Sequence, residues 1–205
     1  MPKSLTRLLF AILLLSSSLA IAAGPECFPE EVLPDNMFPT VRLETTLGDI
    51  VVELDRRRAP VTANNFLRYV LAGAYNNTIF HRVIADFVVQ GGGYTEAIEE
   101  RELYPPIINE SGNGLKNMPM TIAMARYDDP HSATSQFYFN LAANSSLDPN
   151  PRSWGYTVFG QVVSGQDVVS SIGAAETGYH EGLDSDEVPV ATIKLISATV
   201  LEEPH

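Results

Sequence analysis

Short β-prone runs follow one another through most of this chain, and only two segments carry a helical pattern. Residues 41–45 alternate between apolar and polar side chains. A second run, 50–54, follows the turn signal Leu47-Gly48-Asp49, where glycine allows the backbone angles of a tight hairpin. The other β-prone runs are residues 79–84, 87–90, 121–125, 136–141, 157–162 and 191–200.

Two helices are predicted from apolar spacing and end signals. The first begins at Pro60, which suits the first turn of a helix, and Gly73 is a natural terminator. Its apolar stripe runs at i, i+3, i+4 and i+7 from Ala63. The second begins near Ser164, which with Asp167 resembles a capping box. Many short strands with two helices predict a mainly β fold, a closed antiparallel barrel with a helix packed at each end.

The first 23 residues have the pattern of a secretory signal peptide. Lys3 and Arg7 form a charged start, residues 8–15 are an uninterrupted apolar run, and Ala-Ile-Ala at 20–22 is the small-x-small pattern of a cleavage site. The alternative is an uncleaved anchor, but the apolar run is shorter than the roughly 20 residues that span a membrane. We therefore expect cleavage after residue 22 or 23 and export, to the periplasm or, alternatively, by secretion.

The rest of the chain is predicted to be an arm and one domain. Residues 24–39 are rich in proline and have no periodic pattern, which indicates an extended arm. Residues 40–203 contain no linker or repeat and form a single domain. Cys27, the single cysteine of the chain, cannot form an internal disulfide and is interpreted as an incidental free thiol.

The charge balance argues against two classes of partner. The formal net charge is −12, and without the two basic residues of the leader 11 basic side chains oppose 25 acidic ones, a net charge of −14. Phosphate backbones and anionic membrane surfaces repel such a body. We expect no nucleic-acid partner and, after cleavage, no stable membrane insertion.

Common catalytic motifs are missing from the sequence. The four histidines are not at the spacing of a metal site, and no Gly-x-Ser-x-Gly elbow indicates a hydrolase. No Lys-Ser/Thr pair follows the glycines at 91–93, so they do not form a phosphate loop, and a turn that lets chains approach closely is favoured.

Two segments are unusual for a core. Arg82 interrupts an apolar strand, and in the run 136–141 strand alternation places Gln136, Tyr138 and Asn140 on one face. That face suits a groove that holds an apolar group and hydrogen-bonds a backbone. Alternatively, Arg82 pairs with a carboxylate and the amides face water, and the pattern alone favours this second interpretation.

The same segments resemble a known family. Residues 80–92, Phe-His-Arg followed by a phenylalanine and Gln-Gly-Gly, closely resemble the cyclophilin signature. Residues 135–138 are similar to the family's Ser-Gln-Phe-Phe, and residues 75–78, 123–126 and 158–160 resemble further family segments in the expected order. The resemblance extends over about residues 40–200 and is nearest to the short bacterial cyclophilins, including exported ones.

The resemblance implies an eight-stranded antiparallel barrel capped by two helices, and isomerisation of X-Pro peptide bonds without a cofactor or metal. It makes Arg82 the catalytic arginine, with Phe87 and Gln90 also in the catalytic set. The substrate-binding residues that it implies are Val88, Ala125, Arg126, Gln136, Tyr138, Leu147 and Tyr156. Of these, Val88, Tyr138 and Leu147 would line the proline pocket with Phe87. Ala125 and Arg126 would bind substrate through main-chain groups.

Four positions differ from the eukaryotic pattern. Val88 replaces a methionine, Tyr138 a phenylalanine and Arg126 an asparagine. Ser146 stands where eukaryotic relatives have a tryptophan that helps to hold cyclosporin, so a cyclosporin-like inhibitor is expected to bind weakly.

We therefore expect a monomeric isomerase, a folding helper acting on proline-containing segments of exported, unfolded or partly folded proteins. The main alternative is a module of the same fold that binds proline segments or a partner with little turnover. A hydrolase has no recognisable triad or metal set in this sequence.

Overall fold

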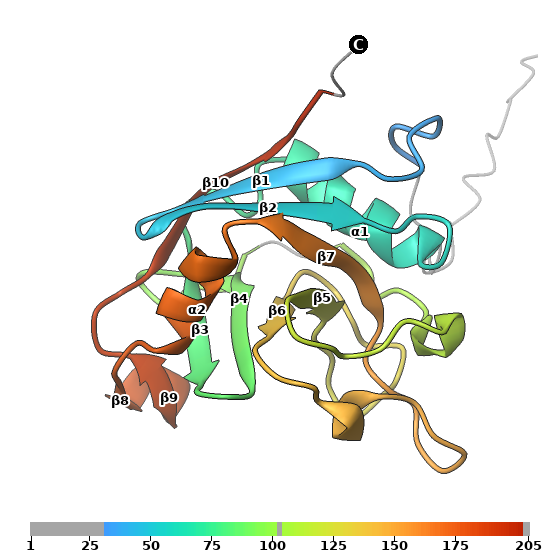
Figure 1. Cartoon of the computed structure of the whole chain (residues 1–205). Helices are drawn as coiled ribbons and strands as arrows, with labels where there is room; N and C mark the ends of the chain where they lie inside the picture. The colour runs from blue at the N-terminus through green and yellow to red at the C-terminus, as the bar shows by residue number, and fades with distance from the viewer. Residues whose placement is uncertain (1–30, 102–103, 203–205) are drawn as a thin grey trace, which may run out of the picture.

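Eight antiparallel strands close into a barrel in the computed structural model, which describes residues 31–101 and 104–202 (Figure 1). Around the barrel the order is β1-β10-β3-β4-β6-β5-β7-β2, which confirms the predicted fold class. The strands are β1 Thr40–Thr45, β2 Gly48–Leu54, β3 Thr78–Ile84, β4 Val88–Thr95, β5 Thr121–Met124, β6 Phe137–Asn140, β7 Val158–Ser164 and β10 Lys194–Val200. The predicted signal peptide and Cys27 lie outside the described residues.

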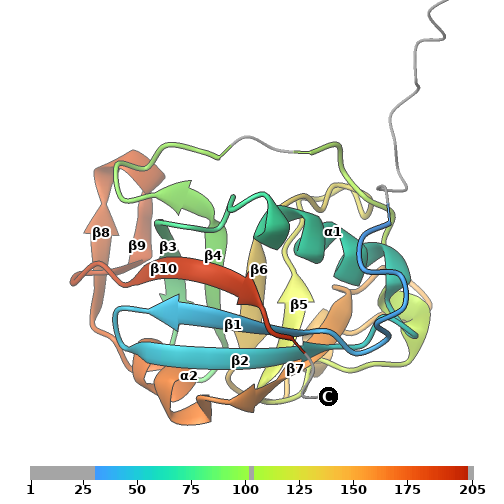
Figure 2. The same ribbon diagram turned by 90° about the horizontal axis from the view of Figure 1, so that it is seen from above.

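Two helices cover the barrel, as predicted. Helix α1, Pro60–Leu71, packs against β7 and β10, and helix α2, Gln166–Gly173, packs against β2, β3 and β4. Seen from above, they lie on opposite sides of β1 and β2 (Figure 2). No helix among the described residues is long and apolar enough to cross a membrane.

The predicted capping box of the second helix is wrong. Ser164 is the last residue of β7, and the N-cap is Gly165, with φ +82° and no side-chain capping bond. A Cβ atom at Gly165 would lie 2.2 Å from the Asp49 carbonyl oxygen of β2. The left-handed backbone and the close approach of β2 therefore require glycine at the N-cap of this helix.

Aromatic rings fill the barrel. The rings of Phe66 on α1 and Phe137 on β6 meet edge to face at 5.5 Å, and Phe159 lies 5.3 Å from Phe66. Gly92, in β4, has φ +84°, and a Cβ there would lie 2.8 Å from the Phe137 ring. The close approach predicted for the glycine run is therefore present, but it occurs within a strand and not in a turn.

A hairpin outside the barrel was not predicted. Strands β8, Thr177–His180, and β9, Ser185–Pro189, form their own two-stranded sheet, and β9 lies against β3. Within the hairpin only Val188 and Pro189 are buried, so its apolar residues show no alternation that would predict strands.

The described part of the predicted arm is held by a buried arginine. Residues 31–39 form bends and one turn, and Arg56, 3% exposed, donates to the carbonyl oxygens of Val32 and Leu33. The same guanidinium donates to Asn64 Oδ1 on α1 at 2.7 Å. This segment is thereby fixed to the first helix.

Candidate active site

A cavity of about 280 Å³ opens on the barrel wall where β3, β4 and β6 adjoin. Its lining contains every predicted site residue except Gln136: Arg82, Phe87, Val88, Gln90, Ala125, Arg126, Tyr138, Leu147 and Tyr156. Gln136 lines the neighbouring hollow, which shares Gln90, Ala125 and Arg126 with this cavity. Residues that are far apart in the sequence are thus brought to one place.

Strand register aligns the polar members of the site. Arg82 on β3 stands opposite Gln90 on β4, and Gln90 stands opposite Tyr138 on β6. Directly paired residues on neighbouring strands project to the same side of a sheet. The three side chains therefore form one row across the wall.

Hydrogen bonds link this row to its neighbours. Arg82 Nη1 donates to Gln90 Oε1 at 3.2 Å, and Gln90 Nε2 donates to Gln136 Oε1 at 2.8 Å. Arg82 Nε donates to Glu187 Oε2 at 2.5 Å. Arg82 therefore pairs with a carboxylate, as the interpretation without a site predicted. It also lines the cavity, so this ion pair does not exclude a binding site.

The apolar wall is a cluster separate from the main core. Val88, Ala123, Tyr138 and Val158 are its buried members, and Phe87, Leu147 and Tyr156 pack against them from the rim. The rings of Tyr138 and Tyr156 meet edge to face at 5.9 Å. The cavity therefore offers a small apolar pocket beside a cation.

The Arg126 side chain belongs to the wall of the site. Its guanidinium lies 4.5 Å from the centre of the Tyr156 ring and donates to the carbonyl oxygens of Tyr127 and Trp154 at 2.7 and 2.9 Å. The backbone N–H of Arg126 has no partner among the described residues. That this N–H binds a substrate backbone, as the resemblance implies, stays a prediction.

Comparison with known proteins identifies the family. The model of the cyclophilin type peptidyl-prolyl cis-trans isomerases matches residues 40–200. The chain belongs to this family. Peptidyl-prolyl cis-trans isomerase cyp18 of Streptomyces antibioticus is 48% identical over 165 residues, which are 79% of this chain and 98% of the relative. Peptidyl-prolyl cis-trans isomerase B of Escherichia coli is 46% identical, over 79% of this chain and 99% of the relative.

Solved structures show the same fold. A cyclophilin type isomerase of Cryptosporidium parvum superposes with a TM-score of 0.67 at 24% identity, over 82% of this chain and 99% of that one. The barrel with two helices is therefore the cyclophilin fold. The family model and the curated relatives show that the chain is a cyclophilin-type peptidyl-prolyl isomerase.

A buried polar network supports the pocket of this cyclophilin from behind. The Tyr138 hydroxyl donates to Asn117 Oδ1 at 2.8 Å, and the Asn117 side chain donates to Asp148 Oδ1 at 3.0 Å. Burial raises the pKa of Tyr138 well above its usual value, so this hydroxyl stays a donor. Asp148 follows Leu147 directly, so one network holds two walls of the pocket.

Asn140 belongs to this network and not to the groove. The prediction that it shares the open face with Gln136 and Tyr138 is wrong, because its side chain is fully buried and donates to Asn117 Oδ1 and Thr121 Oγ1. Strand alternation defines a face but not what covers it. The loop after β6 turns back here, and Asn144 donates to Asn140 Oδ1 at 2.8 Å.

Asn144 also reaches the third wall of the pocket. Its Nδ2 donates to the Phe87 carbonyl oxygen at 2.8 Å. Three residues of this network, Asn117, Asn144 and Asp148, were not predicted as site residues, and none of them lines the cavity. Their amide and carboxyl groups carry no pattern in the sequence that separates them from surface residues.

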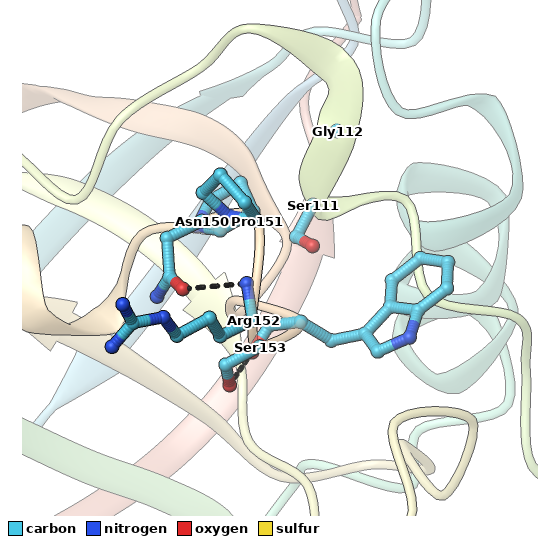
Figure 3. A pocket seen from close by; sticks show the side chains of 8 residues that line it. Ser111, Gly112, Asn150, Pro151, Arg152 and Ser153 are labelled. Atoms are coloured by element: carbon cyan, nitrogen blue, oxygen red, sulfur yellow. Dashed lines mark hydrogen bonds between the residues drawn. The ribbon is translucent and has the colours of Figure 1, made fainter.

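A second pocket, of about 300 Å³, lies outside the site and is lined by Ser111, Gly112 and residues 149–154 (Figure 3). Local contacts shape it, such as the bond from the Arg152 backbone N–H to Asn150 Oδ1 at 3.0 Å. It adjoins the site at Trp154, whose carbonyl oxygen accepts from Arg126. Among the described residues, no group of three or more His, Cys, Asp or Glu could hold a metal ion.

His81 directly precedes Arg82 in the sequence, but its ring is buried in the protein. It is 7% exposed, its ring meets Tyr94 edge to face at 4.8 Å, and its Nδ1 atom is buried without a hydrogen-bond partner. Burial lowers the pKa of His81 from 6.5 to about 4. The ring is therefore neutral near neutral pH.

We expect this histidine to make folding pH-dependent. Between pH 6.5 and 4 the unfolded chain binds a proton at residue 81 that the folded chain does not, so the free energy of unfolding falls as the pH falls and levels off below 4. His81 lowers the free energy of unfolding by about 3 kcal/mol over this pH range. Chemical denaturation at a series of pH values measures it.

The variant His81→Gln should have a flatter pH dependence over that window, and exposed His180→Gln is the matched control. Carboxylates contribute equally to the pH dependence of wild type and of both variants. The difference in slope between wild type and His81→Gln therefore comes from residue 81. Equal slopes in wild type and His81→Gln would contradict a buried neutral ring.

Proposed function

We propose that this cyclophilin accelerates rotation about X-Pro bonds in exported, unfolded or partly folded proteins, and that it does so without a covalent step. The observation that supports this best is the position of Arg82 at an apolar cavity formed by Phe87, Val88, Tyr138 and Leu147. Such a cavity suits a proline ring, and the cation beside it suits the amide nitrogen. An isomerase of Cryptosporidium parvum crystallised in the presence of the dipeptide Ala-Pro has the same fold, at a TM-score of 0.65.

The chemical problem is kinetic. Delocalisation of the nitrogen lone pair gives the peptide bond a rotation barrier of ~18–20 kcal/mol. Before proline the cis form lies only about 0.5–1 kcal/mol above trans. A catalyst must therefore stabilise the twisted state and leave both planar states alone.

In the proposed mechanism, Arg82 stabilises the twisted amide. In the twisted amide the nitrogen is pyramidal and has a free lone pair, which accepts a hydrogen bond from the guanidinium. The planar amide offers no such acceptor, so the bond forms only in the transition state. Arginine stays protonated, and its planar fork is rigid. A thousandfold acceleration requires only about 4 kcal/mol.

The remaining residues hold the substrate. Phe87, Val88, Tyr138 and Leu147 fix the proline ring while the preceding residue turns, and they keep water from competing for the lone pair. Gln90 orients Arg82 from the neighbouring strand. The Arg126 N–H and the adjoining Ala125 segment bind the substrate backbone.

Activity should depend on Arg82. We expect Arg82→Ala to lower kcat/KM by ~100-fold, because it removes a charged transition-state donor. A protease-coupled assay on a proline peptide measures this, with loop residue Arg152→Ala as the control for loss of one positive charge.

If folded Arg82→Ala keeps most of the wild-type rate, the proposed mechanism is wrong. If wild type binds proline peptides and shows no turnover, the alternative of a pure binding module holds.

Export is proposed from the first 23 residues. Protein recovered from an exporting host should begin at Ala23 or Gly24, because Lys3, Arg7, the apolar run and Ala-Ile-Ala match a cleavable signal. Mass spectrometry of the intact protein decides this. A chain that retains Met1 or Pro2 in the membrane fraction would instead be anchored.

Cyclosporin should bind more weakly here than to cyclophilins with a tryptophan at the corresponding position. Ser146 is exposed and directly precedes Leu147, a pocket residue, so it lies at the rim. Burial of a large aromatic side chain contributes roughly 1.5–3 kcal/mol and an indole hydrogen bond about 1 more, which corresponds to at least ~50-fold. Ser146→Trp should restore inhibition, as titration of isomerase activity will show.

The matched control is Ser145→Trp, one residue earlier on the same exposed turn. Equal inhibition of wild type and Ser146→Trp would show that residue 146 does not contact the drug.

A further inference from the structure

The β8–β9 hairpin places a carboxylate on the catalytic arginine. β9 lies beside β3 (Figure 1), and Glu187 Oε2 of β9 accepts the Arg82 Nε hydrogen at 2.5 Å. The two residues are 105 positions apart in the sequence. Glu187 does not line the cavity, so its effect on the reaction must pass through Arg82.

The hydrogen bonds of Arg82 leave one nitrogen uncommitted. Nε donates to Glu187 and Nη1 donates to Gln90, while Nη2 has no partner among the described residues. The guanidinium is planar, so bonds at two of its nitrogens fix both its direction and the rotation of its plane. The Nη2 hydrogens are then held in a set orientation at the cavity.

We propose that Glu187 is a positioning residue for catalysis: it holds the Arg82 guanidinium so that Nη2 faces the amide nitrogen of the bound proline. The proposal rests on the proposed isomerase mechanism. The Arg82 side chain is 36% exposed. Because arginine has many rotamers, an unanchored Arg82 would also sample rotamers that face water. A donor that is already in place requires no reorganisation during the reaction.

A carboxylate beside a cation has an opposing effect. It weakens the positive potential at the amide nitrogen, which by itself would slow the reaction. Both side chains are partly exposed, at 36% and 41%, so solvent screens this effect. The geometric effect is not screened, and we therefore expect removal of Glu187 to lower the rate.

The hairpin itself does not depend on the Glu187 side chain. Cross-strand pairing joins Gly178 to Val188 and Thr177 to Pro189, and Val188 and Pro189 are buried. Variants at position 187 should therefore fold. The neighbour Asp186 is exposed and forms no ion pair with the described residues, so it provides a matched control on the same strand.

The test compares Glu187→Ala, Glu187→Gln, Glu187→Asp and Asp186→Asn with wild type by isomerase kinetics on one proline peptide. We expect kcat to fall roughly tenfold in Glu187→Ala and about threefold in Glu187→Gln, which keeps an acceptor without the charge. Glu187→Asp should recover part of the loss. KM should stay within about twofold throughout, and Asp186→Asn, with the same change in charge as Glu187→Gln, should match wild type.

A second measurement reports on the contact without turnover. In ¹⁵N-resolved NMR spectra, the Arg82 Nε–H signal should be protected from exchange in wild type and Asp186→Asn, and lose that protection in Glu187→Ala. Arg82→Ala assigns the signal.

Several results would overturn the positioning role. They are wild-type or faster turnover in Glu187→Ala, an equal loss in Asp186→Asn, a rise in KM at constant kcat, or an unchanged Nε–H signal. An inactive wild type would instead refute the proposed mechanism, and the NMR comparison would still test the contact.

Discussion

The antiparallel register of β3, β4 and β6 sets Arg82, Gln90 and Tyr138 side by side across the barrel wall. Register has a period of two residues, so a slip of one position would turn each side chain to the opposite face. The aromatic interior prevents such a slip, because Phe137 and Phe139 of the same strand are fully buried. Packing inside the barrel thereby maintains the site outside it.

The pocket combines an apolar surface with polar support. Val88 and Tyr138 are buried members of its apolar wall, and the hydroxyl of Tyr138 donates to Asn117. A buried polar network is stable only when its members are satisfied, and here each amide bonds a neighbour or a backbone group. Such a network holds the pocket walls in place without presenting polar groups to the proline ring.

Much of this fold could be predicted from local patterns. β-prone runs and turn residues located most ends of the barrel strands to within three positions, and Pro60 and Gly73 bounded α1 closely. The exception is β4, which continues through the glycine run to Thr95, five residues beyond the predicted end. The start of α2 was wrong because contact between Gly165 and β2 decides it, and the β8–β9 hairpin was missed because its exposed strands carry little apolar pattern. The resemblance to the family indicated all nine residues that line the cavity.

The sequence by itself indicated the closed barrel and the two helices, because periodicity and turn residues are local properties of the chain, and its short family motifs indicated the residues that line the cavity. Only the tertiary structure decided what stands behind that cavity. It removed Asn140 from the groove, and it brought Glu187 to Arg82 across 105 positions. The physical reason is that a single polar residue carries no local signal of its partner, which is set by how the whole barrel closes.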